Sequence, residues 1–238
     1  MGRSPADIVA DLEARPPAPT GPGEVFVGYG VMGLAFSSGH LLALRRFVAS
    51  SVGPAYRAVW HRNPHGRWAF FQDVPHDQGC MRYFGDDVER MLPATIDLAW
   101  LSPYTLSITA DAGELSLRWR VTLGSTTSTR AMNGLSTAMP KAWWRNPSML
   151  TAMGATAGPL LHVGRVRLTG RVPNGQRFLA NPRQVWRVAA STALLDSADL
   201  GPIGPAPVPG ALGDFCLPQR GVFAIGRTVF QPPPSKPG

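Results

Sequence analysis

Hydrophobic and polar residues alternate over long stretches of this chain. In the segment 115–123, Leu, Leu, Trp, Val and Leu occupy the odd-numbered positions, while Ser, two Arg and a Thr occupy the even-numbered ones. A period of two predicts a β-strand with one buried face and one hydrated face. The same alternation, or a strand-like composition, recurs at 25–29, 40–47, 55–62, 68–74, 96–100, 106–108, 165–168, 184–190 and 221–230.

Turn-forming residues separate these segments. Asn63-Pro64-His65-Gly66 and Asp111-Ala112-Gly113 each stand between two strand-like runs. Asn174-Gly175 is a strong hairpin signal, because both residues tolerate a positive φ. The 26 Gly and 24 Pro residues fit short strands joined by turns better than they fit a helical protein. We therefore expect a mainly β fold, an antiparallel barrel or sandwich in a single domain.

Helix-forming residues are concentrated in two places. Ser4 and Pro5 predict the start of a short helix over Asp7–Ala14, since Ser caps free N–H groups and Pro suits the first helical position. The second segment, 129–163, interrupts the β pattern with Met, Leu and Ala. The predicted organisation is an N-terminal helix and Pro-rich linker (1–23), a β domain (24–231) with a helical insertion (129–163), and a disordered tail (232–238).

The helical insertion contains a stretch rich in large apolar side chains, with Met139, Trp143 and Trp144. Met and Trp side chains adapt to irregular apolar surfaces. The insertion is interpreted as a helical plug over one end of the β domain, and the alternative is a lid over a ligand cavity. In the lid reading, the two tryptophans border an apolar pocket whose other wall includes Trp100, Leu117 and Trp119.

The formal net charge of +8 comes almost entirely from arginine, since Lys141 and Lys236 are the only lysines. The arginines are scattered along the chain, which argues against a nucleic-acid-binding surface. Attraction to an anionic membrane surface is compatible with this charge. Cys80 and Cys216 have no metal-ligand spacing. With no signal peptide and no apolar stretch of membrane-spanning length, the sequence indicates a cytoplasmic location.

Residues with catalytic chemistry are few, and no P-loop, dinucleotide fingerprint, nucleophile elbow or zinc-protease motif is present. We accordingly expect no metal and no cofactor. His61 is a candidate acid or base if its strand face lines a cavity. Asp73 follows an aromatic run where burial would raise its pKa, although pairing with an Arg explains it equally well. Lys141 lies beside Pro140 and Trp143, where apolar surroundings would suit a Schiff base, but an exposed lysine is the simpler explanation.

Three residues carry a resemblance to a known family. Gly66-Arg67-Trp68 follows a tight turn, and Arg227 lies in the last strand-like segment. The combination resembles lipocalin-like (calycin) barrels, in which an Arg of the last strand packs over the Trp of a Gly-x-Trp motif. Related lipocalin-like proteins include carotenoid hydratases and tocopherol cyclases. The resemblance implies an antiparallel lipocalin-like barrel with a cavity for an apolar ligand, and Arg227 stacked on Trp68.

The function predicted from these observations is the binding of a lipophilic small molecule, such as a lipid, isoprenoid or polyketide, in a cavity of the β domain. One alternative is a hydratase, cyclase or isomerase that acts on such a ligand. Another is a peripheral membrane protein anchored by Trp143, Trp144 and Arg145. The candidate ligand-binding side chains are Trp68, Trp100, Trp119, Met139, Trp143 and Trp144.

Overall fold

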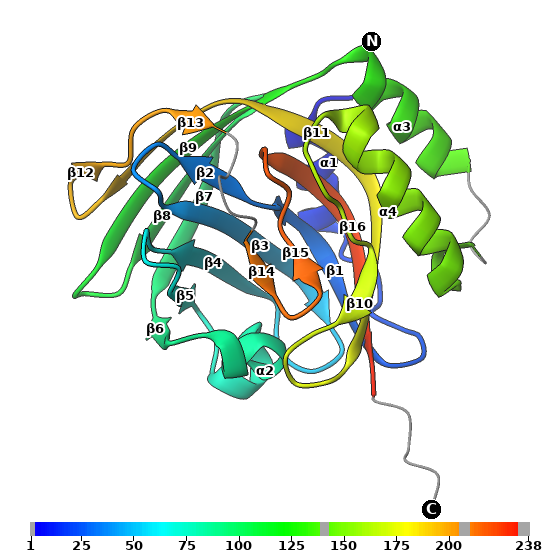
Figure 1. Ribbon diagram of the computed structural model, residues 1–238, viewed down its shortest axis with the longest axis horizontal. Helices are drawn as coiled ribbons and strands as arrows, with labels where there is room; N and C mark the ends of the chain where they lie inside the picture. Colours follow the sequence, from blue (N-terminus) through cyan, green and yellow to red (C-terminus); the bar gives the residue numbers. More distant parts are fainter. Residues whose placement is uncertain (1–2, 139–142, 205–209, 233–238) are drawn as a thin grey trace, which may run out of the picture.

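The computed structural model describes residues 3–138, 143–204 and 210–232 (Figure 1). Strands account for 46% of the structure and helices for 22%, so the predicted mainly β fold is confirmed. The helices are Pro5–Ala14 (α1), Met81–Phe84 (α2), Thr127–Ala138 (α3) and Pro147–Leu161 (α4), with 3₁₀ turns at His76–Gln78 (η1), Gly85–Asp87 (η2) and Trp143–Arg145 (η3).

One large sheet contains most of the strands. These are Glu24–Val31 (β1), Leu34–Phe36 (β2), Leu41–Ser50 (β3), Tyr56–Arg62 (β4), Trp68–Gln72 (β5), Arg90–Pro93 (β6), Thr95–Ser102 (β7), Thr105–Asp111 (β8), Ser116–Gly124 (β9), Thr169–Arg171 (β10), Arg177–Leu195 (β11), Ala198–Asp199 (β12), Ile203–Gly204 (β13) and Val222–Gln231 (β16). A separate hairpin consists of Ala211–Leu212 (β14) and Phe215–Cys216 (β15). The main hydrogen-bonded order is β6-β5-β4-β3-β1-β16-β11-β9-β8-β7.

The two ends of this order are consecutive in the chain. β6 pairs with β5 in parallel, β7 pairs with β8 antiparallel, and only Ala94 separates β6 from β7. The Ala94 amide donates to the Gln72 carbonyl oxygen (3.0 Å), which holds the bend against β5. A single bent stretch therefore joins the two ends of a strongly curved sheet. The ladder is nevertheless mixed and does not close into a barrel among the described strands, so the lipocalin-like barrel stays a prediction.

The predicted hairpin turns are present. Gly66, Gly113 and Gly175 have φ values of +86°, +80° and +84°, which a residue with a Cβ adopts only at a cost in energy. They lie at the turns between β4 and β5, β8 and β9, and β10 and β11. The segment 165–168 is an exception to the prediction: it has no regular secondary structure, and the strand β10 begins only at Thr169.

The concave interior of the sheet is filled with side chains. One cluster contains side chains of β4, β5 and β6 from one end of the strand order and of β7, β8 and β9 from the other, and Val9 of α1 belongs to it. In β9 the alternation is as predicted: Leu117, Trp119 and Val121 are buried, and the residues between them are exposed. This interior is a packed core.

The N-terminal helix α1 packs against the sheet. Ser4 Oγ accepts a hydrogen bond from the Asp7 amide, and the Asp7 carboxylate accepts one from the Ser4 amide, so the predicted cap is formed. Glu13 at the other end accepts hydrogen bonds from Arg46 on β3 and Tyr29 on β1. Residues 5–14 are thus fixed to the β domain by both apolar and ionic contacts.

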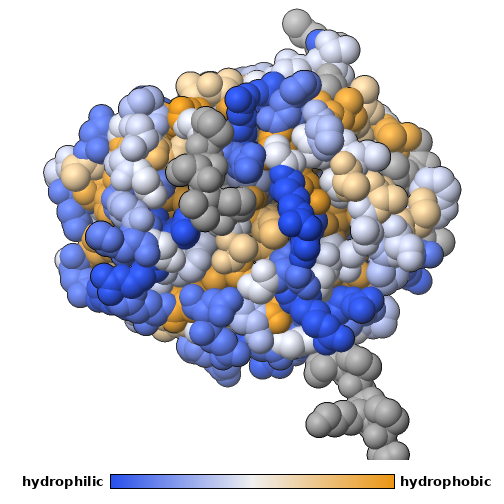
Figure 2. Space-filling view, viewed as in Figure 1, coloured by the Kyte–Doolittle hydropathy of each residue, from blue (hydrophilic) through white to orange (hydrophobic). Residues whose placement is uncertain are grey.

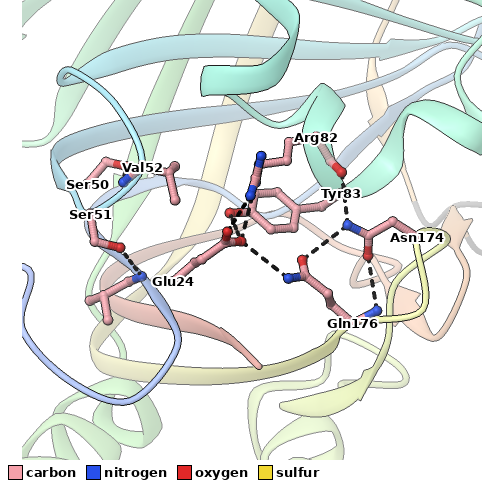
Figure 3. A network of polar contacts seen from close by, with 9 residues as sticks. Glu24, Ser50, Ser51, Val52, Arg82, Tyr83, Asn174 and Gln176 are labelled. Carbon is pink, nitrogen blue, oxygen red and sulfur yellow. Dashed lines mark hydrogen bonds and ion pairs between the residues drawn. The ribbon is translucent and has the colours of Figure 1, made fainter. Parts of the chain in front are cut away.

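The convex face of the sheet carries a second apolar cluster, covered by α2 and the β14–β15 hairpin. Helix was not expected at 76–87, where the sequence shows no apolar periodicity. Glu24 of β1 connects α2 and the β10–β11 turn to the sheet. Its carboxylate accepts hydrogen bonds from the side chains of Arg82, Tyr83 and Gln176 (Figure 3). Burial acts to raise the pKa of Glu24, but these three hydrogen bonds outweigh it and hold the pKa below its usual value.

The predicted helical insertion forms α3, η3 and α4, which we call the cover. In Figure 1 the cover lies beside β11 and β16, with the β14–β15 hairpin next to it. The Asn133 side chain bonds both the amide and the carbonyl of Val185, and Ser136 Oγ donates to the Arg183 carbonyl. The cover is therefore attached to β11 by side-chain hydrogen bonds. Every helix in the described part of the chain is too short or too polar to span a bilayer.

Candidate functional site

A cavity of about 230 Å³ lies between the cover and the convex face of the sheet. Several small residues of the sheet contribute to its floor. The floor includes Gly28 of β1, Ala224 and Gly226 of β16, and Ala180 and Pro182 of β11. Figure 2 shows apolar surface in the central depression of this side of the molecule, bordered by hydrophilic side chains.

The cover and the hairpin supply the other walls of the cavity. Met132 and Leu135 come from α3, and Met153, Ala157, Leu160 and Leu161 come from α4. Phe215, Cys216 and Leu217 close the side nearest β3. Such a wall is mostly hydrocarbon and sulfur, which suits an apolar guest better than a polar one.

Two buried hydrogen-bond donors in the cavity wall have no acceptor among the described residues. One is Nη2 of Arg45, a side chain of β3 that is only 4% exposed. The other is the indole Nε1 of Trp144 in η3. Buried donors are normally paired, so each unpaired donor needs an explanation.

Arg45 is held in place by other contacts. Its Nη1 donates to the carbonyl oxygens of Val31 and Leu44, both at 2.9 Å. Its guanidinium carbon lies 4.4 Å from the centre of the Trp60 ring. Burial lowers the pKa of Arg45 to about 10, which leaves the side chain protonated at neutral pH.

Two of the candidate catalytic residues from the sequence, His61 and Asp73, do not line this cavity. His61 is buried on the concave side of β4, where its Nε2 lies 2.7 Å from Nδ1 of His40. Burial and the neighbouring His40 lower the pKa of His61 to about 4. Asp73 accepts hydrogen bonds from the amide and the guanidinium of Arg57, which is the ion-pair explanation. Lys141 lies outside the described residues.

The candidate ligand-binding residues are divided among several places. Trp144 lines the cavity and is 5% exposed, whereas Trp143 is 44% exposed. Trp68 is buried in the convex-face cluster and is not one of the residues that line the cavity. Met139 lies outside the described residues.

Trp100 and Trp119 belong to the interior core, together with Leu117. Trp119 Nε1 donates to Ser191 Oγ at 2.9 Å. The expectation that these three residues form the second wall of the pocket is therefore wrong. Their strand face is the concave one, and alternation alone does not say which face of a curved sheet borders a cavity.

The predicted stacking of Arg227 on Trp68 is also absent. Arg227 donates to the Thr20 carbonyl oxygen, and Trp68 packs near Phe70 and Trp60. Among the described residues, the arginine that lies over a tryptophan ring is Arg45, on Trp60. Strand pairing explains the difference, because Arg227 lies opposite Val27 and Asn181, while Trp68 lies opposite Arg62 on β4.

Arg45 was missed in the sequence, although a signal was present. It shares its strand face with Leu41, Ala43 and Phe47 by alternation, so a charged side chain is placed in an otherwise apolar row. The scattered arginines of this chain hid that position among many exposed ones.

Comparisons with known proteins do not indicate a function for this site. No protein-family model matches this chain, and neither the curated proteins nor the solved structures contain a match to it.

Proposed function

We propose that the protein binds an apolar small molecule, of lipid, isoprenoid or polyketide type, in the cavity between the cover and the convex face of the sheet. The observation that carries the proposal is the cavity of about 230 Å³ with its hydrocarbon-rich walls. This location differs from the prediction based on the sequence, which puts the ligand inside a β-barrel. The lipocalin-like resemblance stays a prediction and does not support this location.

Binding is favoured over catalysis by the position of the ionisable groups. A hydratase, cyclase or isomerase needs an acid or base in contact with its substrate. His61 and Asp73 lie away from the cavity and are engaged by His40 and Arg57. Within the described part of the chain, the cavity wall offers hydrogen-bond donors rather than a titrating acid–base pair.

Filling the cavity tests the proposal. The uncharged dye Nile red reports transfer into an apolar site by its fluorescence. Ala157→Trp places an indole in the cavity wall, and we expect a loss of Nile red affinity of roughly tenfold or more, because the volume is removed. Ala152→Trp is the matched control, since Ala152 is exposed on the same helix. Equal affinity in both variants would place dye binding elsewhere and contradict the proposal.

A second proposal, contact with a membrane surface, rests on the exposed side of the cover. Leu135, Trp143 and Leu160 are 59%, 44% and 49% exposed, and all three belong to the cover. Two of them also line the cavity, so a membrane bound here would face a route for an apolar ligand.

Vesicle flotation tests the membrane proposal. We expect the protein to float with vesicles of anionic phosphatidylglycerol and phosphatidylcholine, and the variant Trp143→Ser/Leu160→Ser to stay in the lower fractions. Leu101→Ser is the control, because Leu101 is 55% exposed at the end of β7, outside the cover. If the control variant lost flotation equally, the contact would not be specific to the cover.

A further inference from the structure

Arg45 is a charged residue on a buried strand face. By alternation along β3, its side chain lies on the same face as Leu41 and Ala43, in the middle of the sheet. Only 4% of the Arg45 surface is accessible to solvent, and the residue lines the cavity. A long apolar side chain such as Met would fill the same position without desolvating a charge.

The charge of Arg45 is not neutralised by the protein that surrounds it. No carboxylate forms an ion pair with it among the described residues, and its fixed contacts are the two carbonyl oxygens and the Trp60 and Phe215 rings. Tyr56 and Cys80 are the ionisable groups beside it, and burial raises the pKa of both. Both are therefore neutral at pH 7.

The other arginines of the cavity wall are accommodated differently. Arg167 forms an ion pair with Asp214. Arg227 donates to the Thr20 carbonyl oxygen and is only partly buried, so solvent reduces the cost of its charge. Arg45 alone combines near-complete burial, a free Nη2 and no anion, among the cavity residues that the structure describes.

We propose that Arg45 binds the carboxylate end of the ligand, so that the guest of this cavity is an apolar carboxylic acid. This inference rests on the proposed ligand-binding function and adds the class of ligand to it. A carboxylate would accept from the free Nη2 and supply the missing negative charge. One guanidinium balances one carboxylate. A phosphate dianion would need a second cation, but Arg167 is already paired with Asp214, and Arg227 bonds the Thr20 carbonyl and is only partly buried.

The test compares head groups on one hydrocarbon chain. We measure the Kd values of dodecanoate, dodecanol and dodecyl phosphate at pH 7.5 by calorimetry. We expect dodecanoate to bind roughly 10- to 100-fold more tightly than dodecanol, as a charge-assisted hydrogen bond requires. Equal affinity for the acid and the alcohol would overturn the inference, and so would tighter binding of the phosphate.

Two variants locate the head group. Arg45→Met should remove the preference for dodecanoate, leave dodecanol affinity within about twofold, and keep or raise the Tm, since an unpaired buried charge is lost. Arg227→Met, the control that also removes a cation from the cavity wall, should keep the preference. The reverse pattern would assign the head group to Arg227 and overturn the proposal.

A separate measurement does not depend on any variant. Dodecanoate labelled with ¹³C at its carboxyl carbon should show a lower carboxyl pKa when bound to the unaltered protein than when free, because the guanidinium stabilises the anion. A raised pKa would mean an apolar environment without Arg45. If neither dodecanol nor Nile red binds, the proposed function fails as a whole. If both bind without a preference for the acid, only this inference fails.

Discussion

Arg45 and His61 are both polar side chains on buried faces of neighbouring strands, and they differ in how the protein accommodates them. His61 has a neutral partner, His40, and burial lowers its pKa to about 4, so it is uncharged at neutral pH. Arginine cannot lose its proton at physiological pH. Arg45 therefore stays charged in its buried position, and none of the ion pairs among the described residues includes it.

The histidine pair makes stability depend on pH. An unfolded His61 takes up a proton near its ordinary pKa of 6.5, but the folded protein takes it up only near pH 4. Acidification through this window therefore favours the unfolded state. The contribution of the neutral His61 to the free energy of unfolding is fully present above pH 6.5, and it is lost as the pH falls towards 4. Between pH 7.5 and pH 5 we expect a loss of about 2 kcal/mol from His61, measured by urea denaturation.

Two variants separate this effect from general acid denaturation. His61→Gln keeps a hydrogen-bonding side chain next to His40 but cannot take up the proton, so the loss between pH 7.5 and pH 5 should become smaller by a similar amount. His65→Gln is the matched substitution, because it removes an exposed imidazole of the β4–β5 turn without touching the His40–His61 pair. An identical pH dependence of His61→Gln and the unaltered protein would contradict the assignment.

At the level of elements, glycines have three distinct roles that substitution to Ala separates. A Cβ at Gly28 of β1 would overlap the Arg46 carbonyl oxygen of β3, so we expect Gly28→Ala to cost about 2 kcal/mol or more. Gly175 has open space around it but a φ of +84°, so Gly175→Ala should cost about 1 kcal/mol. Gly134 in α3 has open space and ordinary helical geometry, and Gly134→Ala should stabilise the protein by about 0.5–1 kcal/mol.

Thermal and urea unfolding of the three variants gives this order directly. The Gly134 variant is the internal control, because it adds the same methyl group without a contact or an unfavourable φ. If Gly175→Ala proved more damaging than Gly28→Ala, the close approach of β1 and β3 would not be the constraint on Gly28.

Elements with local causes could be predicted from the sequence. The β9 alternation, the Gly66, Gly113 and Gly175 turns and the Ser4 cap each depend on a few neighbouring residues, and all are present. The α2 segment was not expected, because its contacts are distant: Tyr83 bonds Glu24, which is 59 positions away. The cavity wall likewise depends on β3, β16 and the cover meeting in space. Trp144 could be identified from its Met- and Trp-rich surroundings. For Arg45, the alternation of β3 predicts an apolar face, but its contact with the Trp60 ring depends on the fold.

At the scale of the whole molecule, the curved sheet separates two environments. Its concave side is a packed core that includes Trp119 and receives α1. Its convex side is covered by α2, the β14–β15 hairpin and the cover, and it contains the cavity. An alternating strand has an apolar face whether that face borders the concave core or the convex cavity. For this reason the sequence alone predicts a pocket position for Trp100 of β7 and Trp119 of β9. A ligand on the convex side would affect the cover while leaving the concave core unchanged.

The stability of the cover should therefore differ from that of the sheet, and hydrogen exchange measures the difference. The strands of the sheet share continuous ladders, whereas α3 is attached to β11 by the side chains of Asn133 and Ser136. Local opening of the cover does not require the sheet to unfold. We expect the amides of α3 and α4 to exchange at least roughly tenfold faster than those of β1 and β16.

Ligand binding then distinguishes a lid from a plug. If the cover opens to admit a guest, saturating dodecanoate or dodecanol should slow exchange in α3 and α4, because the bound guest adds apolar contacts only to the closed state. The amides of β8, whose side chains Leu106 and Ile108 belong to the concave core, serve as the control and should not change. Exchange of α3 and α4 at the same slow rate as β16, with or without ligand, would show a rigid plug. In that case the cavity would be filled only when the whole domain unfolds.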